Sequence, residues 1–103
     1  MDNSHEATRN VVQELMNEVI EQGFHELVNR PQESSRLNEL LQSAGNSLGE
    51  QLYQIDHHEF KPGSEELHQH WAAITTESQR VSLEFLRQIQ QIRQQYNPRL
   101  KRV

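Results

Sequence analysis

The sequence predicts an all-α protein of three long helices, arranged as an up-down-up bundle or an extended helical hairpin with coiled-coil-like packing. Three observations predict this fold. Apolar residues recur every three or four positions along each long segment, no segment alternates with period two, and proline-containing breaks at residues 29–31 and 60–64 divide the chain. The expected elements are helices at about 4–28, 34–59 and 64–96, followed by a short basic tail at 97–103.

The composition favours a small protein that buries part of its surface against a partner. At 103 residues the chain has room for a single domain, 1–103, with one modest core, and only 33% of its residues are apolar. Chains with so thin a core often complete their burial by forming oligomers or by docking on another protein. We therefore expect a protein partner, in a homodimer or in a hetero-complex.

The chain contains no cysteine, which excludes disulfides, thiolate nucleophiles and cysteine-bound zinc. This composition fits a reducing compartment, so we expect an intracellular, cytoplasmic protein. Polar residues interrupt the apolar positions of the first thirty residues, notably Glu14, Glu18 and Glu21. No signal peptide and no membrane span are therefore expected.

The first helix is predicted from a broad arc of apolar residues at helical spacing. These residues are Val11, Val12, Leu15, Met16, Val19, Ile20, Phe24, Leu27 and Val28. Asn3, followed three residues later by Glu6, is typical of a capping box at the start of a helix. The arc is wider than the ~100° stripe of an ordinary surface helix, so this helix should have more than one neighbour. Gly23 lies in the last turns, where it would permit a bend.

The second helix is predicted from an apolar series close to a heptad repeat. The series is Leu37, Leu41, Ala44, Leu48, Leu52 and Ile55. The small residues Ala44, Gly45 and Gly49 are expected to allow a close backbone approach. Tyr53 and Phe60 fall off this stripe. Aromatic residues displaced from the core face often mark a second contact surface, so both are candidate partner-binding residues.

The third helix has the most regular pattern in the sequence. Ser64 is expected to cap it, with Glu65 and Glu66 in the first turn, where negative charge suits the helix dipole. Its stripe runs through Leu67, Trp71, Ile74, Ser78, Val81, Phe85, Ile89, Ile92 and Tyr96. At 1.5 Å per residue the third helix is about 50 Å long and the second roughly 37 Å. The last turns of the third helix should therefore extend beyond the second.

This overhang is the predicted main contact surface. Apolar residues that continue into it would stay in water unless a partner covers them, and exposed apolar area is unfavourable by about 25 cal/mol per Å². The seam consists of Phe85, Ile89, Ile92 and Tyr96. Three arginines, Arg87, Arg93 and Arg99, would steer an acidic surface toward it. A second copy of the chain or a different helical protein would provide the cover.

Charge is distributed unevenly along the chain. The first 78 residues carry 14 acidic against 4 basic side chains, whereas the rest carry 1 against 6. The basic end raises an alternative, a nucleic-acid-associated helical protein. Against it, the net charge is −5 and no recognition-helix motif is present.

The arrangement of the helices offers these arginines another role. The first and third helices of an up-down-up bundle run parallel, so Arg87 and Arg93 should reach the glutamates near the end of the first helix. Those glutamates are Glu21 and Glu26. We therefore expect ion pairs with glutamates and no nucleic-acid partner.

A histidine-rich region suggests a second alternative, a His/Glu metal-binding helical bundle. Four of the six histidines flank the second break: His57, His58, His68 and His70. If the helix ends meet there, two of these imidazoles with Glu59 or Glu65 would suit Zn²⁺. His68 and His70 are two positions apart and diverge on a helix, so we expect no metal site and no cofactor.

The sequence carries no recognisable catalytic pattern, so we do not expect an enzyme. The glycines at 23, 45, 49 and 63 are isolated, which excludes a glycine-rich phosphate loop. His5 and His25 begin the HExxH pattern of zinc proteases but lack its second histidine. The expected function is therefore that of a small adaptor, a chaperone-like regulator or a subunit of a larger assembly.

Overall fold

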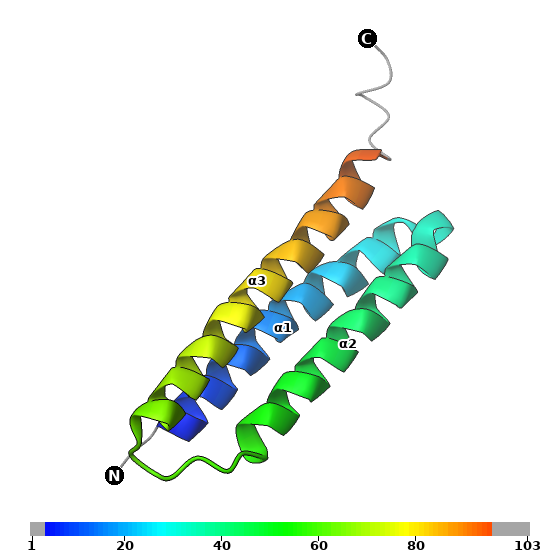
Figure 1. Cartoon of the computed structure of the whole chain (residues 1–103). Helices are drawn as coiled ribbons and strands as arrows, with labels where there is room; N and C mark the ends of the chain where they lie inside the picture. The colour runs from blue at the N-terminus through cyan, green and yellow to red at the C-terminus, as the bar shows by residue number, and fades with distance from the viewer. Residues whose placement is uncertain (1–3, 96–103) are drawn as a thin grey trace.

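The structure, a computed structural model, describes residues 4–95 and confirms the all-α prediction. Its elements are α1 (Ser4–Asn29), a 3₁₀ turn η1 (Pro31–Glu33), α2 (Ser34–Asp56) and α3 (Glu65–Gln95). Figure 1 shows α1 and α3 running in the same direction, with α2 antiparallel to both. As expected from its wide apolar arc, α1 packs against both other helices.

The observed helix bounds differ from the predicted ones chiefly at the end of α2. This helix stops at Asp56, three residues before the predicted position 59, because His57 already leaves the helical region with φ −124° and ψ 86°. The link to α3 is therefore longer than predicted. Asn3, residue 96 and the tail 97–103 lie outside the described residues, so the predicted capping box, the end of the third helix and the tail are not tested.

The start of α3 follows the local chemistry that the sequence indicated. Gly63 has φ +76°, in the left-handed region that glycine adopts without steric penalty. The hydroxyl Oγ of Ser64 then accepts a hydrogen bond from the backbone N–H of Leu67 at 3.1 Å. Ser64 therefore caps α3 as predicted.

The core consists of two apolar clusters separated by a polar contact. One cluster lies toward the α1–α2 connection and contains Val19, Leu37, Leu40, Ala44, Ile89 and Ile92. The other lies toward the α2–α3 link and contains Val12, Ile55, Leu67, Trp71 and Ile74. Between them, the buried Ser78 hydroxyl donates a hydrogen bond to the side-chain oxygen of Gln51. This contact satisfies both polar groups away from water.

The close approach of two helices occurs at a different glycine from the ones predicted. A Cβ atom at Gly45 or Gly49 would meet nothing within 4 Å, so the prediction for these two positions is wrong. At Gly23 a Cβ atom would lie 2.5 Å from Leu41 Cδ2. Gly23 is thus the residue that admits the α2 side chain, and α1 continues as one helix through it. None of the described helices is long and apolar enough to cross a membrane.

Candidate partner-binding surface

The predicted apolar seam of α3 is largely covered by the chain itself. Ile89 and Ile92 are each 1% exposed and pack with Val19 and Leu37 in the first core cluster. The expectation of an uncovered overhang is therefore wrong for these two isoleucines. The physical reason is that the last turns of α1 and the first turns of α2 lie at the same end as the last turns of α3 (Figure 1). Tyr96 lies outside the described residues.

Among the seam residues that the structure describes, Phe85 is the one that remains accessible. It is half-buried, packs on the first core cluster, and lines a hollow of about 350 Å³ between α2 and α3. Leu40 and Ile92 line the hollow with it. The polar side chains of Arg36, Glu39, Ser43 and Gln88 complete it.

A second hollow continues along the same pair of helices. It measures about 160 Å³ and is lined by Ser47, Glu50, Gln51, Gln54, Glu77 and Val81. Along α2 its lining residues follow those of the first hollow, and along α3 they precede them, as expected for antiparallel helices. The two hollows together form one surface, which we call the α2–α3 groove.

The two aromatic residues predicted as surface contacts are exposed, but they lie far from Phe85. Tyr53 is 62% exposed and stacks on His57, with ring centroids 4.1 Å apart. Phe60 is 41% exposed and lies 5.0 Å from the ring of His70. Both belong to the end of the bundle where α2 meets the link. They therefore do not form a single contact surface with Phe85.

Three other large apolar side chains are exposed, although the sequence pattern did not mark them as surface contacts. Phe24, Val28 and Leu83 are each more than half exposed. Phe24 and Val28 belong to the wide apolar arc of α1, which predicted more than one neighbour, but the two neighbouring helices leave these side chains uncovered. Leu83 lies off the α3 stripe and was not singled out. Single exposed apolar residues are common on protein surfaces, so these three define no site by themselves.

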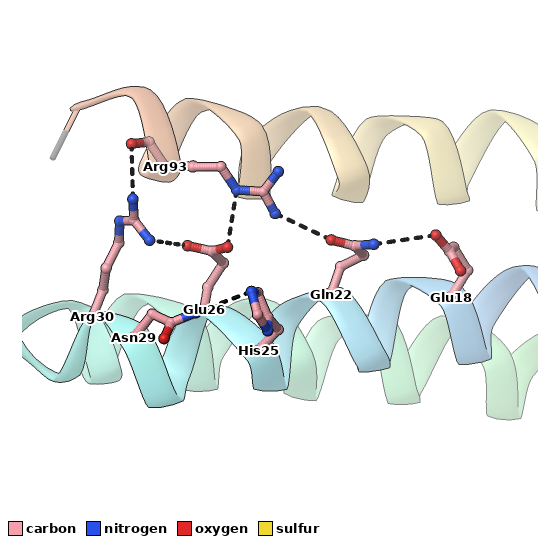
Figure 2. Close-up of polar contacts among 7 residues, drawn as sticks. All are labelled: Glu18, Gln22, His25, Glu26, Asn29, Arg30 and Arg93. Atoms are coloured by element: carbon pink, nitrogen blue, oxygen red, sulfur yellow. Dashed lines mark hydrogen bonds and ion pairs between the residues drawn. The ribbon is translucent and has the colours of Figure 1, made fainter. Parts of the chain in front are cut away.

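A buried glutamate connects the end of α1 to α3 (Figure 2). Glu26 is 1% exposed, and its Oε2 accepts a hydrogen bond from Arg93 Nε at 2.9 Å. Its Oε1 accepts from Arg30 at 2.5 Å. Arg93 also donates to the side-chain oxygen of Gln22 at 3.1 Å. The prediction that Arg93 reaches the glutamates of the first helix is confirmed for Glu26, and this arginine links α3 to α1.

The other arginines of α3 that the structure describes also pair with glutamates. Arg87 forms its ion pair with Glu84, at 3.1 Å, and not with Glu21 or Glu26, so the prediction that it pairs with a glutamate of the first helix is wrong. Arg80 lies 2.7 Å from Glu77. The hydrogen bond from Arg80 lowers the pKa of Glu77 and raises that of Arg80. Pairing of this kind gives no support to a phosphate-binding role, and Arg99 lies outside the described residues.

The histidines gather at the end where the α2–α3 link closes over the bundle. His58 and His70 have ring centroids 5.4 Å apart, which confirms that a histidine of the link meets one of α3. Both also pack on Trp71, at 5.3 and 5.2 Å. The backbone N–H of Phe60 donates to His58 Nδ1 at 3.2 Å. Within residues 4–95, no group of three or more His, Asp or Glu side chains is placed to hold a metal ion.

The chain matches no protein-family model, no curated protein and no solved structure. Its function is therefore inferred from its own residues.

Proposed function

We propose that this protein is a non-enzymatic helical interaction module that binds an α-helix of a protein partner in the α2–α3 groove. The observation that carries the proposal is the accessible face of Phe85 in a hollow between two helices that both pack on α1. A helix laid in this groove would contact α2 and α3 at once and complete a four-helix arrangement.

The lining of the groove suits a protein helix better than a small polar substrate. Phe85 supplies the accessible apolar contact, the nearly buried Leu40 and Ile92 lie beside it, and the polar side chains lie around them. Protein interfaces combine an apolar centre with a polar rim in this way. The partner is a second copy in a homodimer or another protein in a hetero-complex, which fits an adaptor, a chaperone-like regulator or a subunit of a larger assembly.

The non-enzymatic part of the proposal rests on how the chemically capable groups are used. Among the described residues, Glu26 and Arg93 are engaged in a buried structural contact, and His70 Nε2 donates to the carbonyl of Gln54 at 3.0 Å. The described residues that line the α2–α3 groove include no histidine. We place the protein inside the cell, in the cytoplasm, because a chain without cysteine has no need of an oxidising compartment.

Site-specific photo-crosslinking tests the proposal. The photoreactive residue p-benzoyl-phenylalanine is placed at Phe85, inside the groove, or at Leu83, which is exposed on the same helix but does not line the groove. Each variant is irradiated as purified protein and in cells of the native source. Adducts are identified by mass spectrometry, after circular dichroism has shown that each variant is folded.

The expected result is one defined protein adduct, with this chain or with another protein, at position 85 and not at position 83. Mapping of the cross-linked peptide should place the contact on a helical segment of the partner. If position 85 gives no adduct, or if positions 83 and 85 give the same adducts in equal yield, the groove is not the binding site and the proposal is wrong.

A further inference from the structure

We infer that the helix bound in the α2–α3 groove is α2 of a second copy, with the two chains antiparallel about a two-fold axis near Ser43. This inference rests on the proposed function of the groove and adds the identity, direction and register of the partner. A two-fold axis makes the same surface serve both chains, so no second binding surface is required.

The first argument is a second heptad pattern on α2. The residues of α2 that line the groove include Arg36, Leu40, Ser43, Ser47, Glu50 and Gln54, which step by four, three, four, three and four. Most of them are exposed, and only Leu40 also belongs to the core. Such spacing keeps one face of a helix against another helix over its whole length. The core stripe of α2 is already occupied by α1 and α3, so the second stripe is available for a further helix.

The second argument is the size of the side chains along this stripe. Ser43 and Ser47 occupy its middle, while long charged or amide side chains occupy its two ends. Packed helices lie 8–10 Å apart depending on the side chains at the contact, so two serines permit an approach near the lower limit. Because the small residues are central, the closest contact between two copies of α2 falls near Ser43.

The third argument is charge, and it sets the direction. Arg36 and Glu50 are two heptads apart on the same stripe, at equal distances on either side of Ser43, so each lies about 10 Å from it. In an antiparallel pair centred on Ser43, Arg36 of each chain faces Glu50 of the other. A parallel pair in register would set like charges against each other. Glu50 is exposed and forms no ion pair among residues 4–95, and Arg36, which lies 3.6 Å from Glu33, is exposed as well.

The area of the α2–α3 groove is sufficient for a specific dimer. The 23 residues of α2 extend about 35 Å, and two neighbouring helices are about 20 Å across. The groove therefore offers roughly 700 Å² per chain, close to the ~800 Å² per partner of a standard interface. Because much of it is polar, we expect a dimer that dissociates on dilution rather than a permanent one.

A charge exchange tests the pairing. Arg36→Glu sets Glu against Glu50, and Glu50→Arg sets Arg against Arg36, twice in each dimer. Analytical ultracentrifugation should show each single variant dimerising about tenfold more weakly than the parent chain. The double variant Arg36→Glu, Glu50→Arg restores both opposite-charge pairs and should return to within about threefold of the parent. A double variant as weak as the two singles combined would overturn the register.

Cysteine cross-linking tests the position of the two-fold axis. The natural chain has no cysteine, so Ser43→Cys introduces a single thiol at the proposed centre. Gly45→Cys is the matched control, because it lies two residues away on the opposite side of α2, where a Cβ atom meets nothing within 4 Å. Mild oxidation should give a disulfide-linked dimer of Ser43→Cys at least tenfold faster than of Gly45→Cys, since a disulfide requires Cα atoms within about 7 Å. Equal rates would exclude the proposed centre.

Different results would contradict the pairing of two copies and the interaction function of the groove. If the chain sediments as a monomer at several hundred micromolar, while position 85 cross-links to another protein, the self-pairing is wrong and the interaction function stands. If the chain is a dimer but position 85 gives no adduct and the charge exchange has no effect, the groove is excluded as the interface and both proposals are wrong.

Discussion

Glu26 of α1 and Arg93 of α3 are 67 residues apart in the sequence, yet Arg93 Nε donates a hydrogen bond of 2.9 Å to Glu26 Oε2. The carboxylate lies in the interior, and Arg30 at the end of α1 donates to its other oxygen. One buried charge thus meets two guanidinium groups that are themselves partly exposed. The contact with Arg93 favours one position of α3 along α1, because a shift of one turn would remove it and leave the buried Glu26 paired only with Arg30 at its own end of the chain.

Replacing Glu26 by Gln should therefore destabilise the fold. The variant keeps the size of the side chain but removes its charge and turns an amide N–H₂ group toward a guanidinium. We expect a loss of about 1–3 kcal/mol in the free energy of unfolding, measured with urea. Glu18→Gln is the control. Because Glu18 is exposed, this substitution should change the free energy of unfolding by no more than about 0.5 kcal/mol. Equal effects of the two substitutions would show that the buried carboxylate does not hold the helices together.

The glycines of α1 and α2 should respond in opposite ways to alanine. Gly45→Ala and Gly49→Ala add a methyl group in open space and should each stabilise the protein by about 0.5–1 kcal/mol, because alanine favours the helix. Gly23→Ala places a Cβ atom 2.5 Å from Leu41 Cδ2 and 3.1 Å from its Cγ. Overpacking costs about 1–3 kcal/mol, so this variant should be no more stable than the parent.

Thermal unfolding of the three glycine variants measures these effects under one set of conditions. The three variants can be compared directly with one another, because replacing glycine by alanine gives the same gain in helix propensity at each position. A melting temperature of Gly23→Ala raised as much as that of Gly45→Ala would show that Leu41 moves aside freely and that Gly23 is not needed for the approach of α1 and α2.

Asp56 should make the stability depend on pH in the acid range. Arg9 donates to Asp56 Oδ2 at 2.7 Å, and His5 donates to Oδ1 at 3.0 Å. The hydrogen bond from Arg9 holds the pKa of Asp56 below its ordinary 3.8, outweighing the opposite effect of desolvation, and His5 adds to the lowering. A pKa lowered in the folded state contributes stability that is present above the unfolded value and disappears as the pH falls through the folded value.

The stability difference between the parent chain and Asp56→Asn should therefore be larger at pH 5 than below pH 3.8, where it should shrink. Melting temperatures recorded between pH 2.5 and pH 7 measure it. Glu59→Gln serves as the control, since Glu59 has no ion-pair partner among the described residues. A difference that does not change with pH would mean that the contacts of Asp56 are absent in solution.

The histidines around Trp71 should keep its indole ring away from water. Trp71 is the only tryptophan, and His5, His58 and His70 all pack on it at ring distances of 5.6 Å or less. His58 Nδ1 accepts the N–H of Phe60, which holds this ring in the link over Trp71. Removal of the covering rings should expose the indole to water and shift the emission of Trp71 to longer wavelength.

The double variant His58→Gln, His70→Gln should show Trp71 emission at longer wavelength than the parent chain, and equal emission would mean that these rings do not cover Trp71. His68→Gln is the matched control, because His68 is exposed and does not stack on Trp71. Far-ultraviolet circular dichroism should show the helices intact in each variant. Replacing His57, His58, His68 and His70 together should likewise leave folding nearly intact, and a melting temperature that falls on chelation and recovers with Zn²⁺ would reveal a metal site.

The sequence by itself determined the helices, their order and their connections. Spacing of apolar residues specified the three helices, and Gly63 and Ser64 specified the start of α3, because these are interactions among residues close together in the chain. The approach of Arg93 to Glu26 also followed from the sequence, since the short connections require parallel first and third helices. The tertiary structure decided which face of each helix is covered. Nothing local distinguishes Glu26, which is buried, from Glu18, which is exposed, or Gly23, which admits Leu41, from Gly45, which faces open space. The sequence also predicted the apolar stripe that contains Ile89 and Ile92, but not that α1 and α2 bury these two side chains. Burial depends on which residues from elsewhere in the chain pack against them.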